Sequence, residues 1–128
     1  MVIDDQKEIG EVFKQSLPAM GNYEVLACST GKEGLVQVKH FHPDIIFLDV
    51  MMPGMSGTDV AEILQDDPEV ANIPIIFITG LVHNSDLEPG SQQIGGRQFL
   101  PKPFHVNQVV KIIEQTLATS KNSDSSSG

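Results

Sequence analysis

The sequence has little cysteine and few aromatic residues: of its 128 residues one is cysteine, one is tyrosine and none is tryptophan. Because Cys28 has no partner, an internal disulfide is excluded, which fits a reducing compartment. No apolar run reaches about 18 residues, so no membrane span is predicted. The first residues, Met1 to Asp4, lack the charged and long apolar regions of a signal peptide. We therefore expect a cytoplasmic location.

Basic residues are also few, with eight Lys and Arg against 17 Asp and Glu, for a net charge of −9. This excess of negative charge argues against direct nucleic acid binding and weakly favours cations or basic partners. The length fits one domain with a real core. We expect a folded domain over residues 1–118. Residues 119–128 are polar and rich in serine, and we interpret them as a disordered tail or an added segment.

Apolar runs alternate along the chain with apolar residues at helical spacing. Strands are predicted at residues 2–3, 23–27, 44–49, 73–79 and 98–100. Helices are predicted from about Lys7 to Pro18 or Gly21, from Ser29 or Thr30 to about His40, from Thr58 to Pro68, and over residues 106–117. This order predicts an α/β fold, a parallel sheet covered by helices on both faces.

Two parts of this pattern are weak. The first strand is a stub of two residues, so either the sequence begins within the strand or the strand is short. The segment 80–96 contains Pro89 and several glycines but few apolar residues. The alternation requires a helix there, and we expect it to be short, irregular or mobile.

Polar residues follow the predicted strands at only a few places: Asp4, Asp5, Asp49, Thr79 and Lys102. Because the carboxyl ends of parallel strands share one edge of the sheet, these side chains should converge there. Asp49 ends the wholly apolar run 45–48, which is typical of a strand buried on both faces.

Three converging carboxylates repel one another, and a divalent cation removes that conflict. Oxygen ligands without nearby His or Cys favour Mg²⁺. Lys102 adds a positive charge and Thr79 a hydroxyl, both able to hold anionic oxygens. This chemistry suits a carboxylate that attacks phosphorus to form an acyl phosphate, and Asp49 is the predicted nucleophile.

Five features occur in a specific order: Asp4-Asp5 after a strand, Asp49 44 residues after Asp5, the loop 52–57, Thr79 30 residues after Asp49, and the segment 99–104. Together they resemble the receiver domain of a bacterial response regulator in two-component signal transduction, within the chemotaxis-protein-like superfamily. The resemblance spans residues 1 to about 118. It implies a flavodoxin-like, doubly wound (βα)5 fold whose five-stranded parallel sheet has the order 2-1-3-4-5.

The resemblance also implies a role for each residue. Asp49 would accept phosphate from a sensor histidine kinase or a phosphotransfer protein. Asp5, Asp49 and the main-chain carbonyl of Met51 would bind Mg²⁺, with Asp4 contacting the ion directly or from behind a ligand. Lys102 would bind a phosphoryl oxygen and precede Pro103 with a cis bond. Switching would involve Thr79, shifting toward the phosphate, and Phe99, turning inward behind it.

Output in such a domain passes through the fourth helix, fifth strand and fifth helix to an effector domain or protein. A phosphorylation-dependent homodimer is left open. The domain would be no metabolic enzyme, since it catalyses only its own phosphorylation and dephosphorylation. Thr79 as a plain strand residue, Phe99 as ordinary core and Lys102 as surface charge are the simpler alternatives.

Three positions depart from the family pattern. Gln6 stands where an acidic residue is common. Met51 and Leu81 are apolar, and in the family these two positions influence access of water to the phosphate. We therefore hypothesise that the phosphorylated state is long-lived. A measured phosphate half-life of seconds would contradict this. Three rival functions are considered. A haloacid-dehalogenase-like phosphatase needs an Asp at position 51, where this chain has Met. A pseudo-receiver, which binds partners without phosphorylation, is disfavoured by the acidic pair, Thr79 and Lys102. A flavodoxin needs a phosphate-binding loop after the first strand, which is lacking here.

Overall fold

The computed structural model describes residues 1–80, 93–94 and 97–127 of the chain. Its elements in order are β1 (Val2–Ile3), α1 (Lys7–Met20), β2 (Ala27–Cys28), α2 (Gly31–Phe41), β3 (Ile46–Asp49), α3 (Gly57–Asp66), β4 (Ile75–Thr79), β5 (Gln93–Ile94), β6 (Arg97–Pro101) and α4 (Val106–Ser127). The described helices include none that is long and apolar enough to cross a membrane.

The sheet has the strand order β2-β1-β3-β4-β6-β5. The first five of these strands run parallel, and β5 pairs antiparallel with β6 at the edge. Because β6 is the fifth strand that the sequence predicts, the parallel part has the expected order 2-1-3-4-5. The predicted α/β fold class is confirmed, with β5 as an added edge strand.

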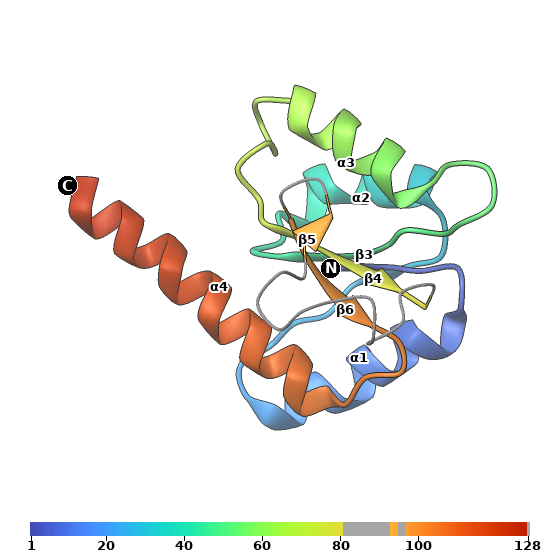
Figure 1. The fold of residues 1–128 in the computed structure, drawn as a ribbon, viewed down its shortest axis with the longest axis horizontal. Helices are drawn as coiled ribbons and strands as arrows, with labels where there is room; N and C mark the ends of the chain where they lie inside the picture. Colours follow the sequence, from blue (N-terminus) through green and yellow to red (C-terminus); the bar gives the residue numbers. More distant parts are fainter. Residues whose placement is uncertain (81–92, 95–96, 128) are drawn as a thin grey trace.

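The helices form one layer on each face of the sheet (Figure 1). Ile46 and Leu48 of β3 belong to the apolar cluster that α2 and α3 cover, whereas Phe47 packs with α1 and α4 on the opposite face. This is the two-residue period of a strand between two helical layers. Since both faces of β3 are covered, its four residues are all buried, as the continuous apolar run predicts.

Two predicted elements are shorter or shifted. The second strand is Ala27–Cys28 rather than residues 23–27, because β1 offers only Val2 and Ile3 as partners and the register starts at Ala27. The fourth strand starts at Ile75, directly after Pro74.

Two helix ends also differ from prediction. Pro18 does not end α1 but lies inside its last turn, where Leu17 remains buried, and the helix ends before Gly21. Ser56 rather than Thr58 caps α3, because the Ser56 side chain and the Asp59 side chain each accept the other's backbone N–H. By contrast, Thr30 caps α2 as expected, its hydroxyl accepting from the Glu33 N–H at 3.1 Å.

The weakly patterned segment 80–96 and the predicted tail have different outcomes. The predicted helix within residues 80–96 falls largely on residues 81–92 and 95–96, outside the described part of the chain, as does Leu81. Gln93–Ile94 is a strand. Beyond residue 118, where a disordered tail is predicted, α4 continues as helical backbone to Ser127 and projects away from the sheet (Figure 1).

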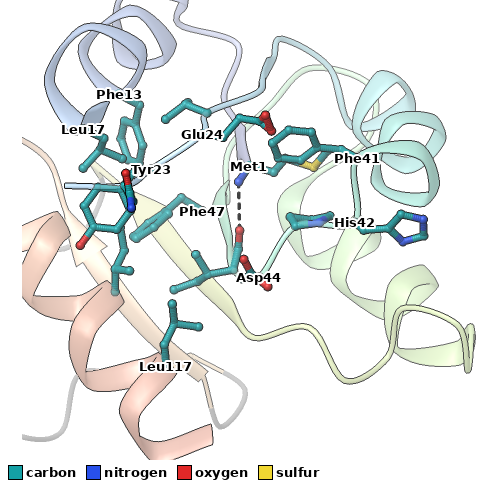
Figure 2. Close-up of a pocket in the computed structure, with 15 residues that line it drawn as sticks. Met1, Phe13, Leu17, Tyr23, Glu24, Phe41, His42, Asp44, Phe47 and Leu117 are labelled. Carbon is teal, nitrogen blue, oxygen red and sulfur yellow. Dashed lines mark hydrogen bonds between the residues drawn. The ribbon is translucent and has the colours of Figure 1, made fainter. Parts of the chain in front are cut away.

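A cavity of about 280 Å³ lies at the amino ends of β1 and β3. Figure 2 shows Phe13 and Leu17 of α1, Phe47 of β3 and Leu117 of α4 around it. The Met1 amino group, beside this cavity, donates to the Ile45 carbonyl at 3.0 Å. Burial lowers the pKa of this amino group to about 6. The cavity lies at the edge of the sheet opposite the predicted site, so it is not where the carboxylates converge.

Candidate functional site

The predicted convergence of strand ends is present at the carboxyl edge of the sheet. Asp4 follows β1, Asp49 ends β3, Thr79 ends β4 and Lys102 follows β6. Asp49 pairs with Ile78 in the β3–β4 register, and Thr79 is the next residue. Among the described residues, the buried polar side chains are those of Asp4, Asp49 and Thr79, at 3%, 3% and 2% exposure. Burying polar side chains costs free energy unless they have partners. The three buried polar side chains therefore make this edge of the sheet the candidate functional site.

Three carboxylates form the acidic part of the site. One oxygen from each of Asp4, Asp5 and Asp49 lies within 4.8 Å of the others, with Asp5 exposed and the other two buried. Asp4 Oδ1 accepts a hydrogen bond from the Gln6 N–H at 2.8 Å. The buried Asp4 Oδ2 accepts no hydrogen bond from the described residues, although the Lys102 ammonium lies 3.0 Å from it.

This donor set fits a divalent cation. Its ligand atoms are all carboxylate oxygens, which suit hard ions such as Mg²⁺. The exposed Asp5 leaves acceptor capacity for an ion and its waters, whereas Asp4 Oδ2 already faces the Lys102 ammonium at 3.0 Å. The cluster can therefore hold a metal.

Lys102 supplies the positive charge of the site. Its Nζ lies 3.0 Å from Asp4 Oδ2 and 3.7 Å from Asp49 Oδ2. The Lys102 backbone N–H donates to the Thr79 carbonyl at 2.8 Å, which ties the start of the β6–α4 loop to β4. The Lys102–Pro103 peptide bond is cis, as predicted. Lys102 is therefore not a simple surface charge but part of the acidic cluster.

The carboxyl group of Asp49 is perturbed by this environment. Its pKa is raised to about 7, mainly by burial and to a smaller extent by repulsion from Asp4. Lys102 and the Met51 backbone N–H lower this pKa. An additional cation would stabilise the ionised form further. The electrostatics thus favour a carboxyl group that would ionise more readily with a positive ion at the site.

The loop after β3 returns directly to Asp49. The Gly57 N–H donates to the Val50 carbonyl at 2.9 Å, and a Cβ at Gly57 would lie 2.2 Å from the Asp49 carbonyl oxygen. Gly54 has a φ of 82°, a conformation that glycine adopts readily. Met51, between Asp49 and this turn, is 58% exposed. Loop and strand together place the Met51 backbone beside the Asp49 carboxylate.

The two predicted switch residues lie where the sequence places them. Thr79 is buried at the end of β4. Phe99 is 3% exposed, pairs with Phe77 across β4 and β6, and packs in the cluster under α2 and α3. An inward Phe99 is thus observed, while its role as a switch stays a prediction.

Gln6 is a site residue whose contact was missed from the sequence. Its side-chain Oε1 accepts a hydrogen bond from Lys102 Nζ at 2.6 Å. No short-range pattern could reveal a contact between residues 96 positions apart. The Ser56 cap, in contrast, has a local signature that could have identified it, since Asp59 follows Ser56 by three residues.

Comparisons with known proteins agree with this geometry. Residues 1–114 match the family model of the response regulator receiver domain. The polar-differentiation response regulator DivK of Brucella ovis is 31% identical over 117 residues, covering 91% of this chain and 94% of DivK.

Solved structures are also similar. The N-terminal domain of a response regulator receiver protein from Methanoculleus marisnigri JR1 has a TM-score of 0.68 at 30% identity, covering 91% of this chain and 94% of that one. The receiver domain of a putative LuxO repressor protein from Vibrio parahaemolyticus has a TM-score of 0.79 at 24% identity, covering 99% and 95%, and shows the shared fold. The chain therefore belongs to the family of response regulator receiver domains of two-component signalling.

Proposed function

We propose that this domain accepts a phosphoryl group on Asp49 from the phosphohistidine of a sensor histidine kinase or a phosphotransfer protein. One observation carries the proposal. Asp49 is a buried carboxylate at the carboxyl edge of the sheet, with two further carboxylates within 4.8 Å and an ammonium 3.7 Å from its Oδ2. A structural carboxylate needs no such mixture of charges, whereas phosphoryl transfer requires both a nucleophile and positive groups for the phosphoryl oxygens.

In the proposed reaction an Asp49 carboxylate oxygen attacks phosphorus. The new O–P bond forms while the P–N bond to the donor imidazole breaks, and the electron pair of that bond returns to the imidazole nitrogen. Lys102 would stabilise the phosphoryl oxygens, since its Nζ already lies beside Asp49. Thr79, at the end of the neighbouring strand, would contribute its hydroxyl after transfer.

We assign Mg²⁺ to Asp5, Asp49 and the main-chain carbonyl of Met51, with Asp4 supporting the ion from the buried side of the cluster. When bound, Mg²⁺ would neutralise the clustered carboxylates and hold oxygens of the transferred group. The raised pKa of Asp49 is consistent with this dependence, because part of the carboxyl population is protonated near neutral pH without an added cation.

The proposal extends to the setting of the domain. It would act in the cytoplasm, catalyse only its own phosphorylation and dephosphorylation, and not bind nucleic acid directly. Phosphorylation would change the surface formed by the segment after β4, strand β6 and helix α4, which would contact an effector. Phe99 lies in β6 and is the proposed switch. The long phosphate lifetime inferred from Met51 stays a prediction.

The experiment is intact-mass analysis of the chain after incubation with Mg²⁺ and acetyl phosphate. The parent should gain one phosphate, about 80 Da, and Asp49→Asn should gain none. Removing Mg²⁺ with EDTA should abolish the gain. A parent that stays unmodified would remove the phosphoacceptor proposal and favour a receiver that binds partners without phosphorylation. An equal gain on Asp49→Asn would place the modification on another residue.

A further inference from the structure

The ammonium of Lys102 is held by more than the acidic cluster. Its shortest polar contact is with Gln6 Oε1, at 2.6 Å, compared with 3.0 Å to Asp4 Oδ2 and 3.7 Å to Asp49 Oδ2. An ammonium has three N–H donors. Gln6 occupies one and Asp4 lies next to a second, which leaves a third for the side of Asp49, where the separation is too long for a hydrogen bond.

Gln6 contacts both the carboxylate of Asp4 and the ammonium of Lys102. It is the N-cap residue of α1, but its side chain makes no capping hydrogen bond. Its backbone N–H instead donates to Asp4 Oδ1 at 2.8 Å, while its side chain reaches Lys102. One residue thus fixes a carboxylate through its main chain and the ammonium through its side chain.

We propose that Gln6 is a positioning residue for Lys102, an inference that rests on the proposed phosphorylation of Asp49. The flexible four-carbon stem of a lysine allows many positions of its ammonium. The Gln6 oxygen holds this ammonium beside the carboxylate cluster, with one donor left for the Asp49 side. Because the amide is neutral, it restrains Lys102 without cancelling its positive charge, whereas a carboxylate at this position would form an ion pair with it.

The test compares Gln6→Leu with the parent by phosphorylation from acetyl phosphate at fixed Mg²⁺, followed by intact mass. Loss of one net hydrogen bond to the ammonium should lower the rate by about threefold or more. Since Gln6 does not belong to the carboxylate cluster, the Mg²⁺ concentration for half-maximal rate should stay within about twofold of the parent's. Gln15→Leu, a change of an exposed glutamine on the same helix, is the matched control and should keep the parental rate.

A second readout does not depend on the reaction. In the ¹H–¹⁵N spectrum of the lysine ammonium groups, a held Lys102 should give a resolved, exchange-protected signal, assigned by its absence in Lys102→Arg. Gln6→Leu should broaden or remove that signal. Gln6→Glu keeps an oxygen acceptor and should retain it.

The failures of the two proposals differ. An unmodified parent would end the proposed function, yet the Lys102 signal would still decide the positioning role. A phosphorylated parent together with an unchanged rate and an unchanged Lys102 signal in Gln6→Leu would overturn the positioning role alone. A uniform fall in Tm, Mg²⁺ response and rate would also overturn it, because that pattern indicates general damage to the fold.

Discussion

At the scale of a single side chain, the buried position of Asp49 lowers the stability of the fold but suits the proposed function. Its carboxyl group is buried next to Asp4, which raises its pKa, while Lys102 only partly compensates. The folded chain without metal therefore holds a proton on Asp49 at pH values where the unfolded chain has released it. Ionising this group in the fold costs free energy, which an ion or a phosphoryl group at the site would offset.

The metal-free chain should thus lose stability as the pH rises. Between the ordinary value of 3.8 and about 7, the folded state binds more protons at Asp49 than the unfolded state, so the free energy of unfolding falls with pH. Denaturant melts in EDTA between pH 5 and pH 8 should show this fall, on the order of a few kcal/mol at most. The parent should be compared with Asp49→Asn, which lacks the group.

Taking the difference from Asp49→Asn removes the contributions of other groups. Met1 is one such group, because its lowered pKa makes stability rise between about pH 6 and pH 8. Saturating Mg²⁺ should flatten the difference curve. A parent whose stability follows that of Asp49→Asn at every pH would show that Asp49 titrates normally.

At the scale of residues, the sequence predicts which side chains form the site but not which hydrogen bonds they make. Asp4, Asp49, Thr79 and Lys102 could be placed because each follows an apolar run, and parallel strands bring such ends together. The hydrogen bond between Gln6 and Lys102 depends on how two loops approach, which no local pattern encodes.

At the scale of elements, the loop between β3 and α3 is a tightly constrained connection to the site. Gly54 in this loop and Gly57, the first residue of α3, are required for different reasons. Gly57 approaches the Asp49 backbone so closely that a Cβ would collide with it, while Gly54 has open space but a positive φ. The loop geometry therefore depends on van der Waals contact at one glycine and on backbone conformation at the other.

Gly57→Ala should destabilise the domain more than Gly54→Ala. The added methyl at Gly57 meets a backbone carbonyl that cannot move without shifting β3, at a cost of about 3 kcal/mol. At Gly54 the cost should be about 1 kcal/mol, from the left-handed backbone alone. Thermal or urea unfolding measures both variants. Equal losses would show that the loop relaxes around the new methyl group.

Element boundaries are where the sequence predictions fail. The second strand is shorter than its apolar run because a strand extends only as far as its partner does, and β1 has two residues. The cap of α3 was predicted at Thr58, two residues too late, although the reciprocal bonds of Ser56 and Asp59 follow a recognisable pattern. Strand β5 was missed because Gln93–Ile94 is too short and too polar to stand out.

At the scale of the whole molecule, two apolar layers on a five-stranded parallel sheet hold the site. The alternation of strands and helices predicts this arrangement and the strand order, since crossover rules leave few other topologies. It does not predict the length of the last helix. Val109 and Ile113 anchor α4 in its first part, and Leu117 packs against the same cluster.

Truncation after Ala118 should therefore leave the domain folded. All three anchors remain, so Tm should change by less than about 3 °C, and phosphorylation from acetyl phosphate should be retained. Truncation after Val110 is the matched comparison, because it removes Ile113 and Leu117 and should abolish cooperative unfolding. A large loss of Tm in the longer variant would place the domain boundary beyond residue 118.

The position of Tyr23 determines what ultraviolet spectroscopy can detect in this protein. Without tryptophan, Tyr23 is the sole strong intrinsic fluorophore, and it lines the cavity at the amino edge of the sheet. The carboxylates and Lys102 lie at the opposite edge. Emission from Tyr23 will therefore report packing between α1 and α4 and remain insensitive to events at Asp49. A dye or engineered indole near the carboxyl edge would be needed to follow those events optically.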